Sequence, residues 1–440
     1  MTTRLAPPET RLAIPSPVVD AVGWLTIYVA LLLFVPTRLV FGPLGSAGAP
    51  SMLFGLGSLV LWVFFRLGSG RGGMTTPQPI RIALGIFLVC VGISYVLAMS
   101  GPMAPAEISP GDVALLALAS WSGTLLLTHD NVPDRSRLET LIWRLCVCGA
   151  IIALLGIFQV LTRQIWVDKL SIPGLTGSAG YSLNARGGFP RPAGTATHPI
   201  EYGTLITMIL PLALYVGFNQ KHRPLLVRWL PAVAVAAVVP LTSSRSAYLG
   251  AAVGFLVCLI GWRRTRRLRM LGVVAVGVAA MSVVTPNLFT SIIGLFAGAA
   301  NDPSIASRTD SYSLAEEFLL RRPVFGRGLG TFLPIYRIFD NQYLLLLVTV
   351  GIVGTAAFIA LGTTALVTSL RLRIRQRDEA TRDLAIALAA SIATGFVCLF
   401  TFDAFAFPMT MGTLFLILGL AGALRRIERG SAMPFVPLVG

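Results

Sequence analysis

Residues 341–369 read NQYLLLLVTVGIVGTAAFIALGTTALVTS, and this stretch contains no charged side chain. A helix rises about 1.5 Å per residue, so a run of this length exceeds the hydrocarbon core of a bilayer, which is about 30 Å thick. Similar apolar runs recur along a chain of 440 residues, of which 55% are hydrophobic and 12% charged. The sequence therefore predicts an all-α protein that crosses the membrane many times.

Twelve apolar runs are predicted to be membrane-spanning helices, at residues 18–35, 46–65, 82–100, 111–128, 141–162, 199–218, 226–243, 246–262, 270–285, 341–369, 384–402 and 408–424. Long loops on a rigid scaffold often carry function, so we expect functional residues in the two long connections. The predicted organisation is a tail at 1–17, five helices over 18–162, a loop at 163–198, four helices over 199–285, a loop with a short helix at 286–340, three helices over 341–424 and a tail at 425–440.

The basic residues predict the orientation of the chain. Lysine and arginine concentrate in the cytoplasmic connections of membrane proteins. Here they fill every second connection and follow the last helix, so we expect both termini to be cytoplasmic and the two long loops to face outward. No signal-peptidase site follows the first run, so we expect the N-terminus to be retained. The basic residues are Arg66, Arg71, Arg81, Arg135, Arg137, Lys221, Arg223, Arg228, those of 263–269 and 371–382, Arg425, Arg426 and Arg429.

The net charge of +16 does not predict a nucleic-acid partner, because most basic residues lie in short segments between apolar runs. The cysteines fall inside apolar runs and lack the spacing of metal ligands or of an extracellular disulfide framework. We therefore expect buried thiols, and neither a metal nor another cofactor. The five cysteines are Cys90, Cys146, Cys148, Cys258 and Cys398.

Arginines also occur in the two outward loops, where the topology rule disfavours them. They indicate an anionic ligand, which guanidinium groups bind well, or else a loop long enough to tolerate basic residues. Arg245 lies in a very short connection at the predicted outer surface, where it needs an anionic partner or must extend to the lipid headgroups. The loop arginines are Arg186, Arg191, Arg308, Arg321, Arg322, Arg327 and Arg337.

The first outward loop ends in GFPRPAGTATHPIEYG, residues 188–203, which presents Arg191, His198 and Glu201 at the mouth of a predicted helix. A histidine in this company either contacts substrate or supports the structure. In the second loop, the spacing of Ser313 and Glu316 is that of a capping box and predicts a short helix over 313–321.

The stretch RRPVFGRGLGTFLPIYRIFDNQYL, residues 321–344, joins that short helix to the apolar run. Its three glycines, Gly326, Gly328 and Gly330, permit either a nest of N–H groups that binds an anion or a tight turn. Asp340 precedes the predicted helix as an N-cap, as a general base at the membrane surface, or as both.

Three motifs together resemble the O-antigen ligase and O-antigen polymerase superfamily of bacterial envelope enzymes. They are RPAGTATHP at 191–199, SSRSAYLG at 243–250, and SRTDSYSLAEEFLLRRPVFGRGLGTF at 307–332 followed by DNQYLLLLVTVGIVG at 340–354. The resemblance implies a GT-C-like bundle in the cytoplasmic (inner) membrane with its active site on the outer face. It also implies metal-independent transfer of a glycan from an undecaprenyl diphosphate carrier to an acceptor hydroxyl, by a polymerase or a ligase. The acceptor is a glycan, a lipid or a protein.

The resemblance also implies roles for individual residues. Many relatives have a histidine where this chain has Asp340, so the aspartate is expected to replace it as the catalytic group. A multi-pass transporter or flippase of lipid-linked oligosaccharide is the competing class, but the ionisable mid-span residues and the internal repeat expected of a carrier are not found. By position, Arg191, Arg245 and Arg308 would hold the diphosphate, with His198, Glu201, Arg327 and Asn341 in support.

Overall fold

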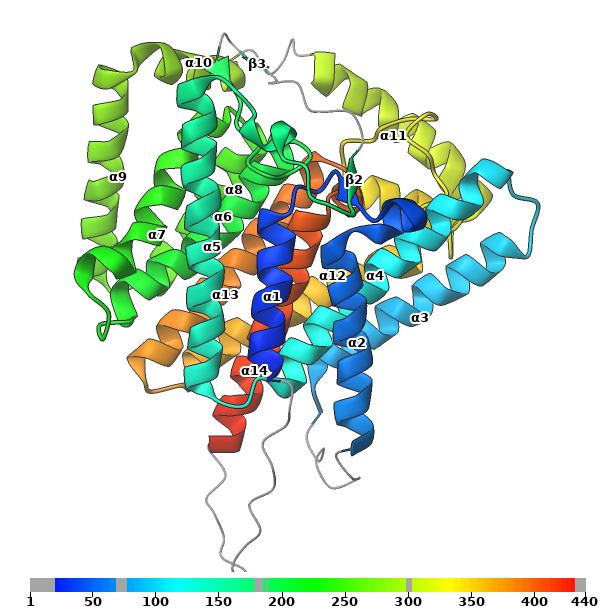
Figure 1. Ribbon diagram of the computed structural model, residues 1–440, viewed down its shortest axis with the longest axis horizontal. Coiled ribbons are helices and arrows are strands. Elements are labelled where there is room, and N and C mark those ends of the chain that lie inside the picture. Colours follow the sequence, from blue (N-terminus) through cyan, green and yellow to red (C-terminus); the bar gives the residue numbers. More distant parts are fainter. Residues whose placement is uncertain (1–19, 69–76, 178–184, 187–188, 298–302, 432–440) are drawn as a thin grey trace, which may run out of the picture.

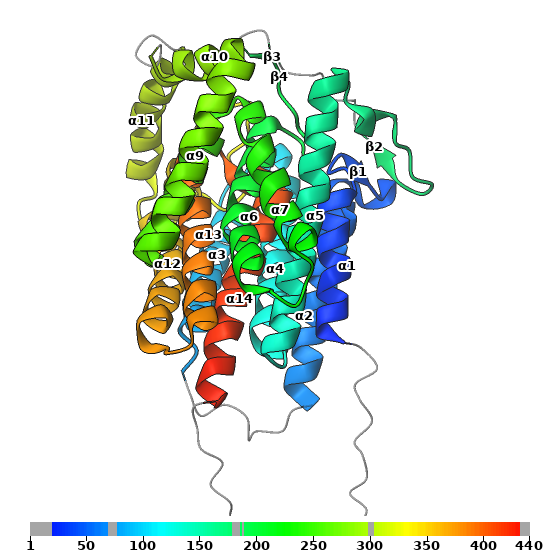
Figure 2. The ribbon, with the colours of Figure 1, turned by 90° about the vertical axis from the view of Figure 1, so that its left-hand side faces the viewer.

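The computed structural model of the protein describes residues 20–68, 77–177, 185–186, 189–297 and 303–431. It is a bundle of long helices that run between two opposite ends of the molecule (Figure 1, Figure 2). In the described ranges, ten helices are long and apolar enough to cross a membrane. Two more apolar helices, α1 and α8, have 14 and 17 residues. The predicted all-α polytopic membrane protein is confirmed.

Each predicted run coincides with one apolar helix. Two further helices of the described chain, α10 (Pro286–Ala297) and α11 (Pro303–Arg321), occupy the second long loop. The apolar helices are α1 (Ala21–Phe34), α2 (Pro50–Gly68), α3 (Pro79–Met99), α4 (Pro105–Asn131), α5 (Arg135–Thr162), α6 (Pro199–Asn219), α7 (Leu225–Val238), α8 (Arg245–Gly261), α9 (Arg264–Val284), α12 (Gln342–Arg375), α13 (Glu379–Cys398) and α14 (Pro408–Ser431).

Short elements join these helices. Strand β1 (Leu39–Val40) pairs antiparallel with β2 (Thr176–Gly177), which ties the first outward connection to the loop over 163–198. Strand β3 (Ala185–Arg186) pairs antiparallel with β4 (Phe189–Pro190). The 3-10 turns are η1 (Gly42–Gly48), η2 (Trp166–Lys169), η3 (Pro240–Thr242), η5 (Leu399–Thr401) and η6 (Ala404–Ala406).

Two predicted boundaries were wrong. Helix α11 begins at Pro303 and not at residue 313, because proline is well suited to the first turn of a helix. Ser313 therefore lies inside the helix, and its capping-box spacing does not mark a start. Helix α14 continues to Ser431, seven residues beyond the predicted end of the last apolar run at residue 424. The predicted tail at 1–17, and that at 425–440 from residue 432 onward, lie outside the described residues.

Both long loops lie at one end of the bundle, which we call the loop end, together with α10 and α11 (Figure 1). The start of α1 and the end of α14 lie at the opposite end, which we call the basic end. Arg137 pairs there with Asp20, and the Arg135 guanidinium lies 3.4 Å from the Glu428 carboxylate. The charge distribution predicts that the basic end is cytoplasmic.

Cysteine labelling tests this orientation. Ile335, at the loop end, is 84% exposed, and Arg377, at the basic end, is also exposed. We expect Ile335→Cys in a cysteine-free background to react with an impermeant maleimide in intact cells, and Arg377→Cys to react only after lysis. The reverse pattern would overturn the predicted orientation.

Helices α6 and α14 form the centre of the bundle, and they position the loop end. In each of them, 89% of an 18-residue window is buried, whereas in α9 no residue of such a window is buried. Helix α6 begins at Pro199, directly after the loop that carries Arg191 and His198. Helix α14 begins at Pro408, and its first turn lies beside the same loop. The core of the bundle therefore fixes that loop.

Candidate functional site

The segment over residues 190–197 packs into the loop end of the bundle and does not lie on its surface. The Gln159 side chain of α5 accepts the N–H of Gly194 at 2.9 Å and donates to the carbonyl of the same residue at 2.8 Å. Thr195 donates its hydroxyl to the Leu33 carbonyl of α1 at 2.5 Å. These bonds anchor the segment to α1 and α5, and so fix the position of Arg191.

Arg191 reaches the turn that starts α8. The residue is 8% exposed, and its Nε donates to the carbonyl of Thr242 at 3.2 Å. Thr242 ends η3, Ser243 follows in a left-handed conformation with φ of 43°, and α8 begins at Arg245. The structure thus brings two of the three predicted ligand arginines, from separate loops, to the same turn.

His198 caps the N-terminus of α6. Its Nδ1 accepts the N–H of Ile200 at 3.1 Å, so the Nε2 of the neutral ring carries the proton. Burial, and next the positive charge of Arg191, lower the pKa of His198 to about 4. The ring is therefore neutral at pH 7, and we expect it to donate a hydrogen bond and not to serve as a base.

Glu201 connects the first turns of the two central helices. The side chain is fully buried, and its two oxygens accept the N–H of Thr197 at 2.9 Å and that of Met409 at 2.8 Å. A carboxylate that satisfies two backbone donors in this way holds structure together. We infer that Glu201 supports the site without contacting substrate.

Asp340 has an unusual backbone conformation. Its φ is 50°, in the left-handed region that few residues other than glycine adopt. Asn341, and not Asp340, is the N-cap of α12, because its side chain accepts the N–H groups of Tyr343 and Leu344 at 3.0 and 3.4 Å. The interpretation of Asp340 as a helix cap was therefore wrong, and its carboxylate is not used in capping.

Asp403 holds Asp340 in this conformation. Its two carboxylate oxygens accept the N–H groups of Phe339 and Asn341, each at 3.0 Å, and so bracket Asp340. Burial raises the pKa of Asp403 above its usual range, and the negative charge of Asp340 adds to this, whereas the backbone N–H groups oppose it. Sequence reasoning missed Asp403, although a lone acid between two apolar helices was a usable signal.

The connection between α13 and α14, residues 399–407, joins the separate parts of the site. Asp403 in this connection binds the backbone around Asp340. Thr401 donates its hydroxyl to Ser246, which follows Arg245, at 2.7 Å. The Phe407 ring lies 6.3 Å from the His198 ring, measured between centroids. Residues from the three motifs therefore contact one short connection.

The glycine-rich turn over residues 323–330 completes a broken helix. Helix α12 is interrupted at Gly351, where φ is 70° and ψ is −173°, so backbone groups near the break lose their helical partners. Within a membrane such groups must be satisfied by other parts of the protein. The turn supplies the partners: Arg327 and Gly328 donate to the carbonyls of Val348 and Thr349 at 3.1 and 2.8 Å, and Ile352 and Val353 donate to those of Pro323 and Val324 at 2.9 and 3.3 Å.

All three glycines of this turn have positive φ, as a tight turn requires. A Cβ on Gly326 would lie 2.5 Å from the Thr349 carbonyl, so only glycine allows this approach. Because the N–H groups of Arg327 and Gly328 are already bound to α12, they are not available as a phosphate-binding nest. The structure favours the tight-turn interpretation.

The Arg327 side chain binds to other residues of the protein. Its guanidinium lies 2.5 Å from the Glu107 carboxylate, which also accepts the Tyr336 hydroxyl at 2.7 Å. The rings of Phe318, Phe332 and Tyr336 surround the same guanidinium at 5.6 to 5.7 Å. We infer that Arg327 stabilises the loop and does not contact the substrate.

Arg308 belongs to α11, but its side chain lies outside the described residues. The second half of α11 packs on the start of α12 through an apolar cluster that includes Phe318, Phe332 and the fully buried Phe339. This packing holds α11 next to Asp340. The role of Arg308 in diphosphate binding stays a prediction.

Substitution of Gly351 tests the broken helix. A Cβ there would lie 2.3 Å from the Val324 carbonyl, and alanine disfavours the left-handed backbone. We expect Gly351→Ala to destabilise the protein by about 2–5 kcal/mol, the combined cost of strain and overpacking, measured as thermal stability in detergent. Gly85→Ala, in a helix with open space around the added Cβ, is the control and should not lower stability, since alanine favours the helix more than glycine does.

Fold and site together define a polytopic membrane protein whose functional candidates gather at the loop end. The family model for O-antigen ligase matches residues 230–359, which run from α7 into α12. This match confirms the resemblance to the O-antigen ligase and polymerase superfamily and indicates a glycan-transferring enzyme of the bacterial envelope. It covers less than a third of the chain and includes Arg245, Arg308 and Asp340, but neither Arg191 nor Asp403. No curated protein matches the chain.

Proposed function

We propose that the protein transfers a glycan from an undecaprenyl diphosphate carrier to an acceptor hydroxyl at the outer face of the cytoplasmic membrane. Asp340 is the general base of this proposal. The observation that carries it is that Asp403 brackets Asp340 and holds its backbone at a φ of 50°. Strained conformations of this kind persist where the surrounding structure imposes them, and they cluster at active sites.

In the proposed reaction, the acceptor oxygen attacks C1 of the first sugar. The bond from C1 to the phosphate oxygen breaks, and undecaprenyl diphosphate leaves with the bonding electrons. The acceptor proton passes to the carboxylate of Asp340, which must therefore be ionised before the reaction. Asp403 is a positioning residue, because it touches the backbone around Asp340 and not the substrate.

The departing diphosphate carries concentrated negative charge, and Arg191 and Arg245 are the proposed groups that stabilise it. Arg191 contacts the turn at Thr242, and Arg245 follows that turn at the start of α8. Each guanidinium can donate two parallel hydrogen bonds to phosphate oxygens. In this proposal the neutral His198 ring donates a further hydrogen bond to the diphosphate. With arginine supplying the positive charge, the transfer needs no metal ion.

Transfer in proteoliposomes tests the proposal. The purified full chain is supplied with an undecaprenyl diphosphate-linked glycan and with acceptors extracted from the host envelope. We expect glycan to appear on the acceptor, at a rate unchanged within about twofold by EDTA, because arginine replaces the metal in stabilising the leaving group. Movement of the carrier across the bilayer without glycan transfer would instead show a flippase, and loss of activity in EDTA would refute metal independence.

A further inference from the structure

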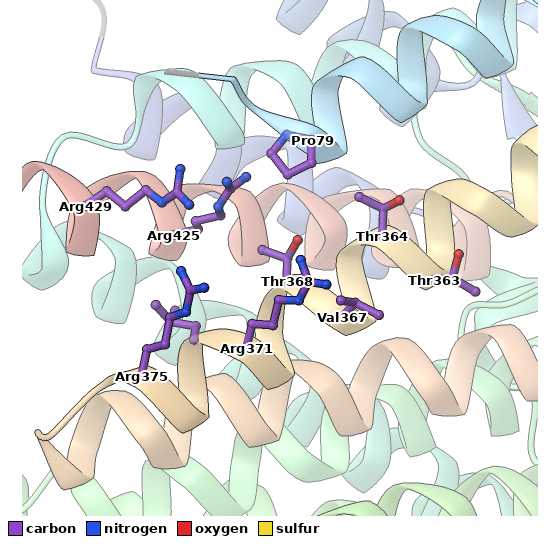
Figure 3. A pocket seen from close by; sticks show the side chains of 10 residues that line it. Pro79, Thr363, Thr364, Val367, Thr368, Arg371, Arg375, Arg425 and Arg429 are labelled. Atoms are coloured by element: carbon purple, nitrogen blue, oxygen red, sulfur yellow. The ribbon is translucent and has the colours of Figure 1, made fainter. Parts of the chain in front are cut away.

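A cavity lined by arginines lies at the basic end, remote from the site described above. Its volume is about 380 Å³, and it lies between the last turns of α12 and α14 and the start of α3 at Pro79. Four arginines line it, Arg371 and Arg375 from α12 and Arg425 and Arg429 from α14 (Figure 3). The cavity thus concentrates four positive charges.

Three neighbouring arginines at the same end bind to partners within the protein. Arg135 and Arg266 form ion pairs with Glu139 and Asp383, at 2.8 and 2.5 Å. Arg373, between two of the cavity arginines in sequence, donates to the Gly261 carbonyl at 2.6 Å. The topology rule explains why arginine occurs at this end, but it does not explain why four of them share one cavity.

Within the described residues, none of the four cavity arginines forms an ion pair or a hydrogen bond. The Nη1 atom of Arg425 is buried without a hydrogen-bond partner. Of the segments outside the described ranges that adjoin this end, residues 69–76 and 432–440 contain neither aspartate nor glutamate, and residues 1–19 contain one acid, Glu9. An anion bound in the cavity would give the buried Nη1 of Arg425 a partner, whereas Arg371, Arg375 and Arg429 are exposed and also reach water.

The shape of the cavity indicates what kind of anion it binds. Its lining extends along α12 from Arg375 to Thr363, about 18 Å at the helical rise per residue. The arginines are at one end of this length, and Thr363, Thr364 and Val367 are at the other, toward the middle of the helix. Val367 is 40% exposed, as expected for a side chain that faces lipid. A headgroup with attached acyl chains suits this arrangement better than a free phosphate ion.

We propose that this cavity is a binding site for a phospholipid with an anionic headgroup. The four arginines bind the headgroup phosphate, and the acyl chains lie along the exposed face of α12 beside α3. Basic pockets between membrane helices are suited to such headgroups. This inference does not depend on the transfer reaction, because the cavity and Asp340 lie at opposite ends of α12.

Native mass spectrometry of the delipidated full chain tests the proposal. Phosphatidylglycerol, phosphatidylcholine and inorganic phosphate are added separately. We expect phosphatidylglycerol to bind in preference to the other two. The double variant R371Q/R425Q should bind it about 10- to 30-fold more weakly, from the contribution of each arginine near a charged lipid. The matched control R377Q/R382Q removes two exposed arginines at the same end, outside the cavity, and should bind as the wild type does.

Three outcomes would overturn the proposal. Equal losses in the two double variants would show general attraction to a basic surface. Competition by inorganic phosphate at similar concentration would identify a free anion as the ligand. Equal binding of phosphatidylcholine would show no selection for negative charge. If R371Q/R425Q does not survive purification, the single variant R371Q is tested, and wild-type binding in that variant also counts against the proposal.

Discussion

Asp340→Asn is expected to lower the rate of glycan transfer by about 10² to 10⁴, the usual contribution of general-base catalysis. The change removes the proton-accepting carboxylate and little else. Asparagine adopts the left-handed backbone at least as readily as aspartate, and Asn341, the cap of α12, is untouched. The variant should therefore fold and still bind the lipid-linked donor, which thermal stability and donor binding will establish. Wild-type transfer by this variant would remove Asp340 from the mechanism.

Asp340→His is the companion to this variant, because histidine also tolerates the left-handed region and accepts a proton. A base must be unprotonated to act, so activity falls as the pH drops through its pKa. Histidine titrates near 6.5, well above a free carboxyl at about 3.9. We expect Asp340→His to retain activity and to move the acidic limb of the kcat/KM profile to higher pH. If the acidic limb of the profile does not move, the group that titrates there is not residue 340.

Arg191→Ala and Arg245→Ala are each expected to lower transfer by about 10² to 10³, the range measured for groups that stabilise charge in the transition state. Lysine at either position should restore little, because its point charge cannot reproduce the planar pair of donors. Arg321→Ala is the matched control in the same end of the protein. Its guanidinium is exposed and pairs with Glu317, so its loss should change the rate less than twofold.

Arg191 also has a structural contact, the hydrogen bond from its Nε to the Thr242 carbonyl. A loss of activity at this position therefore requires a check of folding. Thermal stability of the Arg191 variants, with and without the lipid-linked donor, separates the two effects. Stabilisation by the donor in the wild type, and its absence in a variant that folds normally, supports diphosphate binding. Full activity of both lysine variants would contradict paired guanidinium contacts.

The sequence by itself determined the membrane architecture. Whether a segment crosses a bilayer depends on its own length and apolarity, which is why each predicted run coincides with a helix of the bundle. The motifs around Arg191, Arg245 and Asp340 were likewise visible without a structure, because each is a local pattern. The sequence predicted the starts of helices less well, since α11 begins at Pro303 and not at the capping-box spacing of Ser313.

Only the tertiary structure decided which groups are available for chemistry. Asp340 and Asn341 are both good helix caps in sequence, and it is Asp403, from a distant connection, that bonds to the backbone and leaves the cap to Asn341. Arg327 is likewise neutralised by Glu107 of α4. Such pairings join residues far apart in the chain, so no local pattern specifies them, and they arise because buried charges and broken helices must find partners inside the folded protein.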